Sequence, residues 1–111
     1  MTKRLVRFSA LLLLLWFPSP SEPAWRSVAG AVQDEGGNPL PASVVQLENE
    51  ADQSVRSYIT GVDGRYYFSE VSYDIDYTVK ARYRKYWSKA MALSDSNSAA
   101  HPEIDLIIPI E

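Results

Sequence analysis

The chain has no cysteine and a single histidine, His101, among its 111 residues. Without cysteine the protein can form no disulfide and no thiolate nucleophile, and it cannot carry a lipid anchor attached through an N-terminal cysteine. His101 lies beside Pro102 in a polar stretch, where nothing in the sequence places it next to a nucleophile. We therefore expect no enzymatic activity and no cofactor, and a domain held together by its hydrophobic core alone.

The sequence also lacks an apolar run long enough to cross a membrane. The run Phe8–Phe17 is apolar except for Ser9, and it is about half of the ~20 residues that a spanning helix needs. Three basic residues precede this run, and a segment rich in proline and serine follows it at 18–24. Because this order is typical of a secretory signal peptide, we predict a signal-peptide helix over residues 1–24, cleaved after Ser21 or Ala24. The alternative is an uncleaved anchor.

The predicted mature chain, residues 25–111, is acidic. Removing residues 1–24 takes away three of the eleven basic and one of the fourteen acidic residues, which leaves a net charge of −5. Such an excess of negative charge argues against nucleic acid as a partner. An exported domain without disulfides suits a bacterial periplasm or cell surface, and there we expect it, with membrane contact only through a retained signal segment.

Seven short segments of the mature chain show the patterns of β-strands, either alternating apolar and polar residues or rich in β-branched and aromatic ones. They are Trp25–Gln33, Ser43–Glu48, Val55–Thr60, Arg65–Phe68, Tyr77–Tyr83, Trp87–Leu93 and Ile104–Ile110. A short helix over Lys85–Leu93 is an alternative, because alanine, methionine and leucine favour helices. With turn residues between the segments, the pattern predicts an all-β fold, an antiparallel β-sandwich.

The strongest local signal is Asp63-Gly64, which lies between Val55–Thr60 and Arg65–Phe68. Both central residues of a tight primed turn must tolerate positive φ, and this dipeptide does. The sequence therefore predicts a β-hairpin whose two arms are these strands.

Three motifs together resemble a known family. They are Val28-x-Gly30-x-Val32-x-Asp34-x-x-Gly37-x-Pro39-Leu40-Pro41-x-x-x-Val45-x-Leu47, then Thr60-x-x-Asp63-Gly64-Arg65-Tyr66-x-Phe68-x-x-Val71, then Tyr77-x-Val79-x-Ala81. In this combination the chain resembles the carboxypeptidase regulatory-like domain from about Val28 to Ala81. It departs from the family pattern at Gly61-Val62, where an acidic residue often follows the threonine, and in the basic aromatic stretch around Arg84–Trp87.

The resemblance implies a seven-stranded, prealbumin-like (Ig-like) β-sandwich over residues 25–111. Such domains are usually accessory modules beside peptidase domains, at the entrance of outer-membrane receptors or in cell-surface proteins, and related sandwiches include carbohydrate-binding modules. Transthyretin-like sandwiches that hydrolyse a purine breakdown product use several histidines and an arginine. The single histidine of this chain argues against that activity.

The most informative surface is a basic aromatic segment, residues 80–89. It contains five of the eight basic residues of the mature chain, three aromatic residues and no acidic one. Aromatic faces stack on sugar rings or pack against a protein partner, and arginines add cation–π or carboxylate contacts. The candidate ligand-binding residues are Arg82, Tyr83, Arg84, Tyr86 and Trp87. The structural alternative is that Tyr83 and Trp87 face the core while the cations solvate the outer face and discourage edge pairing.

Acidic residues offer a weaker candidate. Asp74 and Asp76, with Asp63 or Glu70 nearby, supply the hard oxygen ligands that Ca²⁺ prefers. Acidic residues also favour turns and solvent, and this spacing lacks a full ligand set. We predict no metal site.

The sequence thus favours an exported, non-enzymatic accessory module that binds carbohydrate, such as an envelope glycan. The alternative is a protein–protein interaction module that docks on a cell-envelope complex. An exposed row of aromatic residues would favour the sugar, and a flat apolar patch or an open edge strand would favour a protein. A hydrolase would require a pocket that gathers His101 with carboxylates from distant strands.

Overall fold

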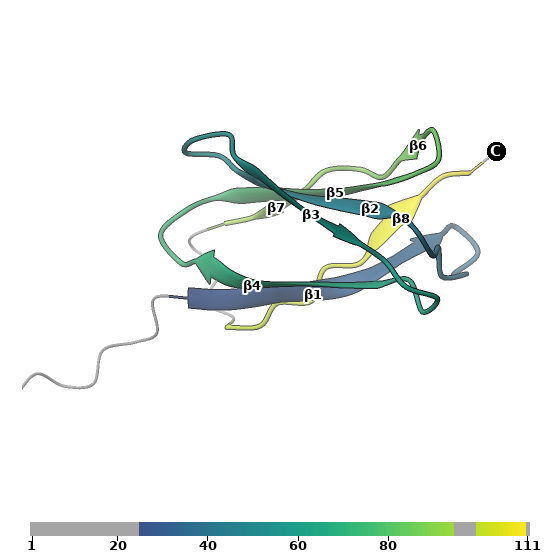
Figure 1. Cartoon of the computed structure of the whole chain (residues 1–111), viewed down its shortest axis with the longest axis horizontal. Helices are drawn as coiled ribbons and strands as arrows, with labels where there is room; N and C mark the ends of the chain where they lie inside the picture. Colours follow the sequence, from purple (N-terminus) through teal and green to yellow (C-terminus); the bar gives the residue numbers. More distant parts are fainter. Residues whose placement is uncertain (1–24, 95–99, 111) are drawn as a thin grey trace, which may run out of the picture.

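The computed structural model describes residues 25–94 and 100–110, so the predicted signal peptide lies outside the described residues. The described chain forms a two-layer β-sandwich (Figure 1). Its strands are β1 Trp25–Asp34, β2 Val44–Asn49, β3 Val55–Ile59, β4 Arg65–Ser72, β5 Tyr77–Tyr83, β6 Tyr86–Trp87, β7 Met91–Leu93 and β8 Leu106–Ile108. The predicted all-β sandwich is confirmed.

One layer has the strand order β4-β1-β8, and the other has the order β3-β2-β5-β6 with β7 also paired to β5. All pairs between these strands are antiparallel except β1–β8, which is parallel. This is a departure from the predicted purely antiparallel fold. The chain leaves the five-stranded sheet after β7 and runs beside β1 in the same direction, so β8 needs the long connection that parallel pairing requires.

The predicted strand Trp87–Leu93 is interrupted and forms both β6 and β7. Ser88 causes the interruption, because its side chain points into the sheet and its hydroxyl accepts a hydrogen bond from Ala81 N at 2.9 Å. Ser88 N in turn donates to Ala81 O at 2.8 Å. β5 therefore pairs with β6 on one side of Ser88 and with β7 on the other. The helical alternative over this segment is wrong.

The predicted hairpin at Asp63-Gly64 is also wrong, since β3 pairs with β2 and β4 pairs with β1 in the other sheet. The turn is closed by a hydrogen bond from Gly64 N to Gly61 O at 3.0 Å, and Gly64 has a φ of 70°. A Cβ on Gly64 would lie 2.7 Å from Val32 O, so only glycine lets the turn dock on β1. The segment is a corner that carries the chain from one layer to the other (Figure 1).

The core lies between the two layers and follows the predicted alternation. On β5, Tyr77, Val79 and Ala81 are buried, as the pattern predicts for one face of this strand. The other fully or almost fully buried hydrophobic residues are Val28, Val32, Leu40, Val45, Leu47, Tyr66, Phe68, Val71, Leu93, Leu106 and Ile108. No helix in the described ranges is long and apolar enough to span a membrane.

Candidate functional site

The basic aromatic segment folds into a short hairpin in which β5 and β6 are joined by Arg84 and Lys85. Arg82 lies opposite Trp87, and Tyr83 lies opposite Tyr86. Residues opposite each other in an antiparallel pair share one face of the sheet, and neighbours along the strand alternate. The register therefore places Arg82 and Trp87 on the outer face and the two tyrosines on the face toward the other layer.

On the outer face, the Trp87 side chain is 42% exposed. Two cations from β5 lie over its ring, with Lys80 Nζ 4.9 Å and Arg82 Cζ 5.7 Å from the ring centroid. Both distances are within the range of a cation–π contact. Arg82 is oriented further by a hydrogen bond from its Nη1 to Arg84 O at 3.1 Å. This face therefore presents one indole flanked by two positive charges.

On the opposite face, Tyr83 and Tyr86 are half-buried and pack against the core. Each ring also has a cation of the turn above it, with Arg84 Cζ 5.0 Å from the Tyr83 centroid and Lys85 Nζ 5.4 Å from the Tyr86 centroid. The five predicted binding residues thus come together in one hairpin but do not form one row of exposed aromatic rings. The structural alternative holds for Tyr83, which faces the core side, and fails for Trp87.

We call Lys80, Arg82, Arg84 and Lys85, together with Trp87, the basic hairpin. Within the described part of the chain, no carboxylate forms an ion pair with any of these four cations. Arg65, by contrast, is paired with Glu103. Lys80 and Lys85 belong to this site although they were outside the predicted binding set. Lys80 could have been predicted, because it lies two residues before Arg82 on a strand and therefore on the same face of the sheet. The contact between Lys85 and Tyr86 could not, because it depends on the turn.

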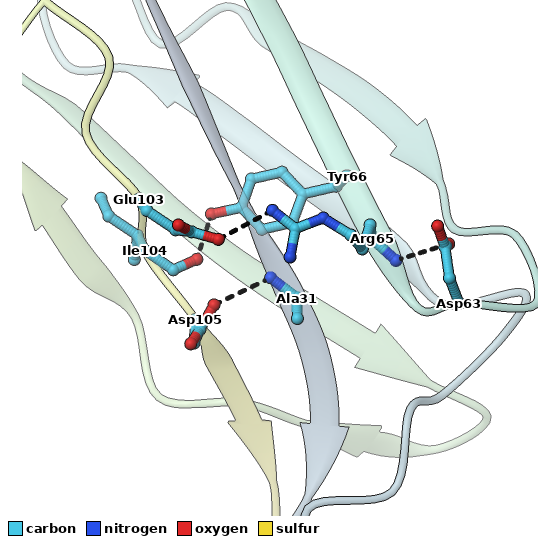
Figure 2. Close-up of polar contacts among 7 residues, drawn as sticks. All are labelled: Ala31, Asp63, Arg65, Tyr66, Glu103, Ile104 and Asp105. Atoms are coloured by element: carbon cyan, nitrogen blue, oxygen red, sulfur yellow. Dashed lines mark hydrogen bonds and ion pairs between the residues drawn. The ribbon is translucent and has the colours of Figure 1, made fainter.

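A second polar cluster, which we call the closing cluster, comprises Arg65, Tyr66, Glu103, Ile104 and Asp105 (Figure 2). Arg65 Nη2 donates to Glu103 Oε1 at 2.7 Å, and the Tyr66 hydroxyl donates to Ile104 O at 2.5 Å. Asp105 Oδ1 accepts a hydrogen bond from Ala31 N at 3.0 Å. These contacts join β4 and β1 to the segment that leads into β8, so the cluster closes the three-stranded sheet.

The electrostatics of the closing cluster follow from its contacts. Burial, and then the negative charges of Asp105 and Glu103, raise the pKa of the Tyr66 hydroxyl above its usual value, so it stays protonated and donates its hydrogen bond. The hydrogen bond and the charge of Glu103 raise the pKa of Arg65. The Arg65 charge is paired with Glu103, and the Asp105 carboxylate is bound to a backbone N–H, which indicates a structural role.

His101, which lies in a polar stretch of the sequence, has a specific partner. Its exposed ring lies with Nδ1 2.7 Å from the hydroxyl of Ser27, a buried residue of β1. Among the described residues no carboxylate is hydrogen-bonded to the ring, so the pair lacks the third group that orients a catalytic histidine. The contact ties the segment after residue 100 to β1, and it gives no support to the hydrolase alternative.

The acidic candidates do not gather. Asp74 N donates a hydrogen bond to the Ser72 hydroxyl at 3.1 Å, and Asp63 Oδ1 accepts one from Arg65 N at 3.0 Å in the corner turn. Across residues 25–94 and 100–110, no group of three or more histidine, aspartate or glutamate side chains is placed to hold a metal ion.

The chain is similar in sequence to a known domain family. The model of the carboxypeptidase regulatory-like domain matches residues 27–105. The chain belongs to the carboxypeptidase regulatory-like domain family. This match covers both the corner turn and the basic hairpin, and it extends beyond the predicted motifs to the closing cluster.

Two solved structures are similar to this chain in fold. One is a DUF3823 family protein from Parabacteroides merdae, with a TM-score of 0.56 and 17% identity over 79% of this chain and 47% of that one. This chain therefore spans about half the length of that protein. The other is the dioxygenase domain of a dioxygenase carbohydrate-binding protein fusion from Streptomyces sp. SirexAA-E, with a TM-score of 0.58 and 14% identity over 86% of both chains. A search of curated protein sequences finds no significant match.

Proposed function

We propose that this carboxypeptidase regulatory-like domain is an exported, non-catalytic module that binds an acidic carbohydrate through the basic hairpin. The observation that carries the proposal is the set of four cations without a carboxylate partner in the described residues, on a chain with a net charge of −3. Like charges kept close together without counter-charges repel each other, and an anionic ligand would relieve that repulsion.

Trp87 narrows the class of ligand. A bare tryptophan face stacks on the C–H groups of a neutral sugar, but here Lys80 and Arg82 lie over the ring. A sugar that carries carboxylates or sulfates beside its ring would meet both the indole and the two charges. Arginine and lysine also form stronger hydrogen bonds to ionised acceptors than to neutral hydroxyls. The site therefore suits an acidic glycan better than a neutral one.

Backbone geometry in the turn supports a binding role. Arg84 has a φ of 57°, a conformation that glycine adopts at little cost and that other residues adopt rarely. A bulky arginine at a position suited to glycine is a local cost, and such costs cluster at functional sites. The strained backbone holds the Arg84 guanidinium over Tyr83 at the tip of the hairpin.

The context of the fold is compatible with this proposal. The name of the Streptomyces protein that is similar in fold records a carbohydrate-binding protein fused to its dioxygenase domain. Its likeness to this chain concerns the fold alone. An envelope or extracellular glycan is the acidic carbohydrate that an exported domain would meet, and a bacterial periplasm or cell surface is the location we propose.

The test is calorimetric titration of the intact chain with an oligogalacturonate and, separately, with a neutral oligosaccharide of equal length. We expect saturable binding of the acidic oligosaccharide, weakened at least about tenfold by Arg82→Gln, since a charge-assisted hydrogen bond contributes roughly 1.5–3 kcal/mol. Lys89→Gln removes one cation outside the basic hairpin and is the matched control, expected to bind as the wild type does. Equal affinity for both oligosaccharides, or binding unchanged by Arg82→Gln, would contradict the proposal.

A second candidate function is the protein-interaction module. The observation that favours it is the open edge of β3, all five residues of which are exposed. This edge lies on the opposite side of the five-stranded sheet from β6, so the two candidate surfaces do not overlap.

A further inference from the structure

The sandwich has two edge strands joined by the corner turn, and they differ in how they are protected. β4 is irregular, because its pairing with β1 shifts register between Arg26 and Val28, and Glu70 has a φ of 55°. Arg56 covers this irregularity, with its guanidinium donating to Ser69 O at 2.6 Å and to Glu70 O at 3.2 Å. Bulges and charged side chains are devices that prevent edge pairing, and β4 has both.

β3 has neither device on its free side. It is regular along its whole pairing with β2, and no described strand lies on its other edge. It contains no lysine or proline, and its one charged residue, Arg56, is turned to the carbonyl groups of β4. Val55 is 51% exposed and Ile59 is 67% exposed. An exposed, regular and apolar edge of this kind is a template for pairing with another strand.

Hydrogen bonding to β2 determines which backbone groups of β3 are free. Thr60 N donates to Ser43 O at 3.0 Å, and Asn49 N donates to Ser54 O at 2.8 Å. Antiparallel partners alternate between hydrogen-bonded and non-bonded pairs. The backbone groups of Arg56 and Tyr58 therefore face β2, and those of Val55, Ser57 and Ile59 face outward.

This outward set is symmetric about Ser57. If a second copy of β3 lies antiparallel with Ser57 opposite its own equivalent, then Val55 of each copy lies opposite Ile59 of the other. All three outward residues then fall in hydrogen-bonded pairs, since these recur every second residue. On the outer face the apolar pairs Val55–Ile59 cover each other, and on the inner face Arg56 lies opposite Tyr58. No two like charges are opposed.

We propose that the protein forms a two-fold symmetric dimer through β3, with Ser57 on the symmetry axis. The occupant is a second copy of this chain because the edge complements itself in both hydrogen-bond phase and side-chain pairing, as an isologous interface must. Pairing joins the two five-stranded sheets into one, with a basic hairpin at each end of it, since β3 and β6 are opposite edges. The dimer does not depend on the ligand proposed above.

The first test is sedimentation velocity of the intact chain over a range of concentrations, with Ser57→Pro and Ser57→Ala as a matched pair. Proline removes the outward N–H of residue 57 and leaves the hydrogen bonds to β2 in place, whereas alanine keeps that N–H. We expect the wild type and Ser57→Ala to dimerise and Ser57→Pro to dissociate at least about tenfold more readily, because two symmetry-related hydrogen bonds are lost. A wild type that is monomeric throughout would overturn the proposal.

The second test does not depend on how Ser57→Pro folds. The chain has no cysteine, so Ser57→Cys introduces the only thiol. Hydrogen-bonded antiparallel neighbours have Cα atoms about 5.5 Å apart, within the range that a disulfide spans. We expect rapid oxidation of Ser57→Cys to a covalent dimer and slow oxidation of Glu35→Cys, an exposed loop control. Equal rates for the two variants would overturn the proposal and leave the edge to an extended segment of another protein.

Discussion

The closing cluster and the basic hairpin both contain arginine, and they differ in what the arginine side chains contact. In the closing cluster, Arg65 is paired with Glu103, and the Tyr66 hydroxyl is bound to Ile104 O (Figure 2). In the basic hairpin, Arg82 and Arg84 lie over aromatic rings, and no described carboxylate pairs with either. We therefore assign a structural role to the closing cluster, whose arginine is paired within the protein, and we propose ligand binding for the basic hairpin, whose arginines have no described carboxylate partner.

The largest expected effect breaks the closing cluster at Gly30. A Cβ at this position would lie 1.9 Å from Ile104 O and 2.9 Å from Tyr66 Cε1. Gly30→Ala must therefore displace the segment that leads into β8, and we expect a loss of about 3 kcal/mol or more in the free energy of unfolding. Urea unfolding followed by circular dichroism measures it.

The matched control for Gly30 is Gly61→Ala. The nearest atom to a Cβ at Gly61 is Asp63 Oδ1, at 3.8 Å, and this glycine has ordinary backbone geometry. We expect a change within roughly 0.5 kcal/mol. A Gly30→Ala protein as stable as Gly61→Ala would show that the segment at Ile104 is not packed on β1 as described.

A smaller effect is expected when Tyr66 loses its hydroxyl. Tyr66→Phe keeps the buried ring but leaves Ile104 O without its donor, and we expect a loss of about 1–2 kcal/mol in the free energy of unfolding. Chemical denaturation near pH 7 measures this loss. An unchanged stability would mean that water replaces the hydroxyl at no cost.

The same variant has a defined pH dependence. Because the pKa of Tyr66 is raised in the folded protein, the folded state holds the phenol proton more tightly than the unfolded chain, in which the pKa is about 10. This contribution to stability is complete below that pH and is lost as the pH rises above it. We expect the stability difference between wild type and Tyr66→Phe to be constant up to about pH 9 and to shrink as the pH rises above about 10. A constant difference would contradict the assignment.

The basic hairpin is expected to respond in the opposite direction. Arg84→Gly removes a side chain from a position with a φ of 57° and should stabilise the domain by up to about 1 kcal/mol. The same variant should bind the acidic oligosaccharide more weakly. Thermal unfolding and titration together check this trade between stability and binding, and a variant that is less stable than the wild type would argue against strain at Arg84.

The smallest effect sharpens the comparison at the exposed ion pair. Glu103→Gln removes the charge opposite Arg65, but both side chains are about half exposed. Exposed pairs contribute about 0–1 kcal/mol, so we expect a loss of less than about 1 kcal/mol that becomes smaller in high salt. A larger loss, unaffected by salt, would show that Glu103 stabilises the fold through something besides its charge.

Much of this fold could be predicted from residue patterns alone. Alternation identified the strands and their buried faces, as on Tyr77–Tyr83, because a side chain's face depends only on its parity along a strand. The motifs around Gly30, Gly37 and Gly64 indicated the family, which the match over residues 27–105 establishes. Export, location and ligand remain predictions.

Strand pairing was decided by the tertiary structure. The Asp63-Gly64 signal predicted a turn but not that its arms enter different sheets, because Gly64 docks on Val32 O of β1, a residue far away in sequence. The residues of the basic aromatic segment were also predicted, but the turn that reverses the chain and places Trp87 opposite Arg82 was not. A turn or a parity is a local property, but which strands become neighbours depends on the packing of the whole core.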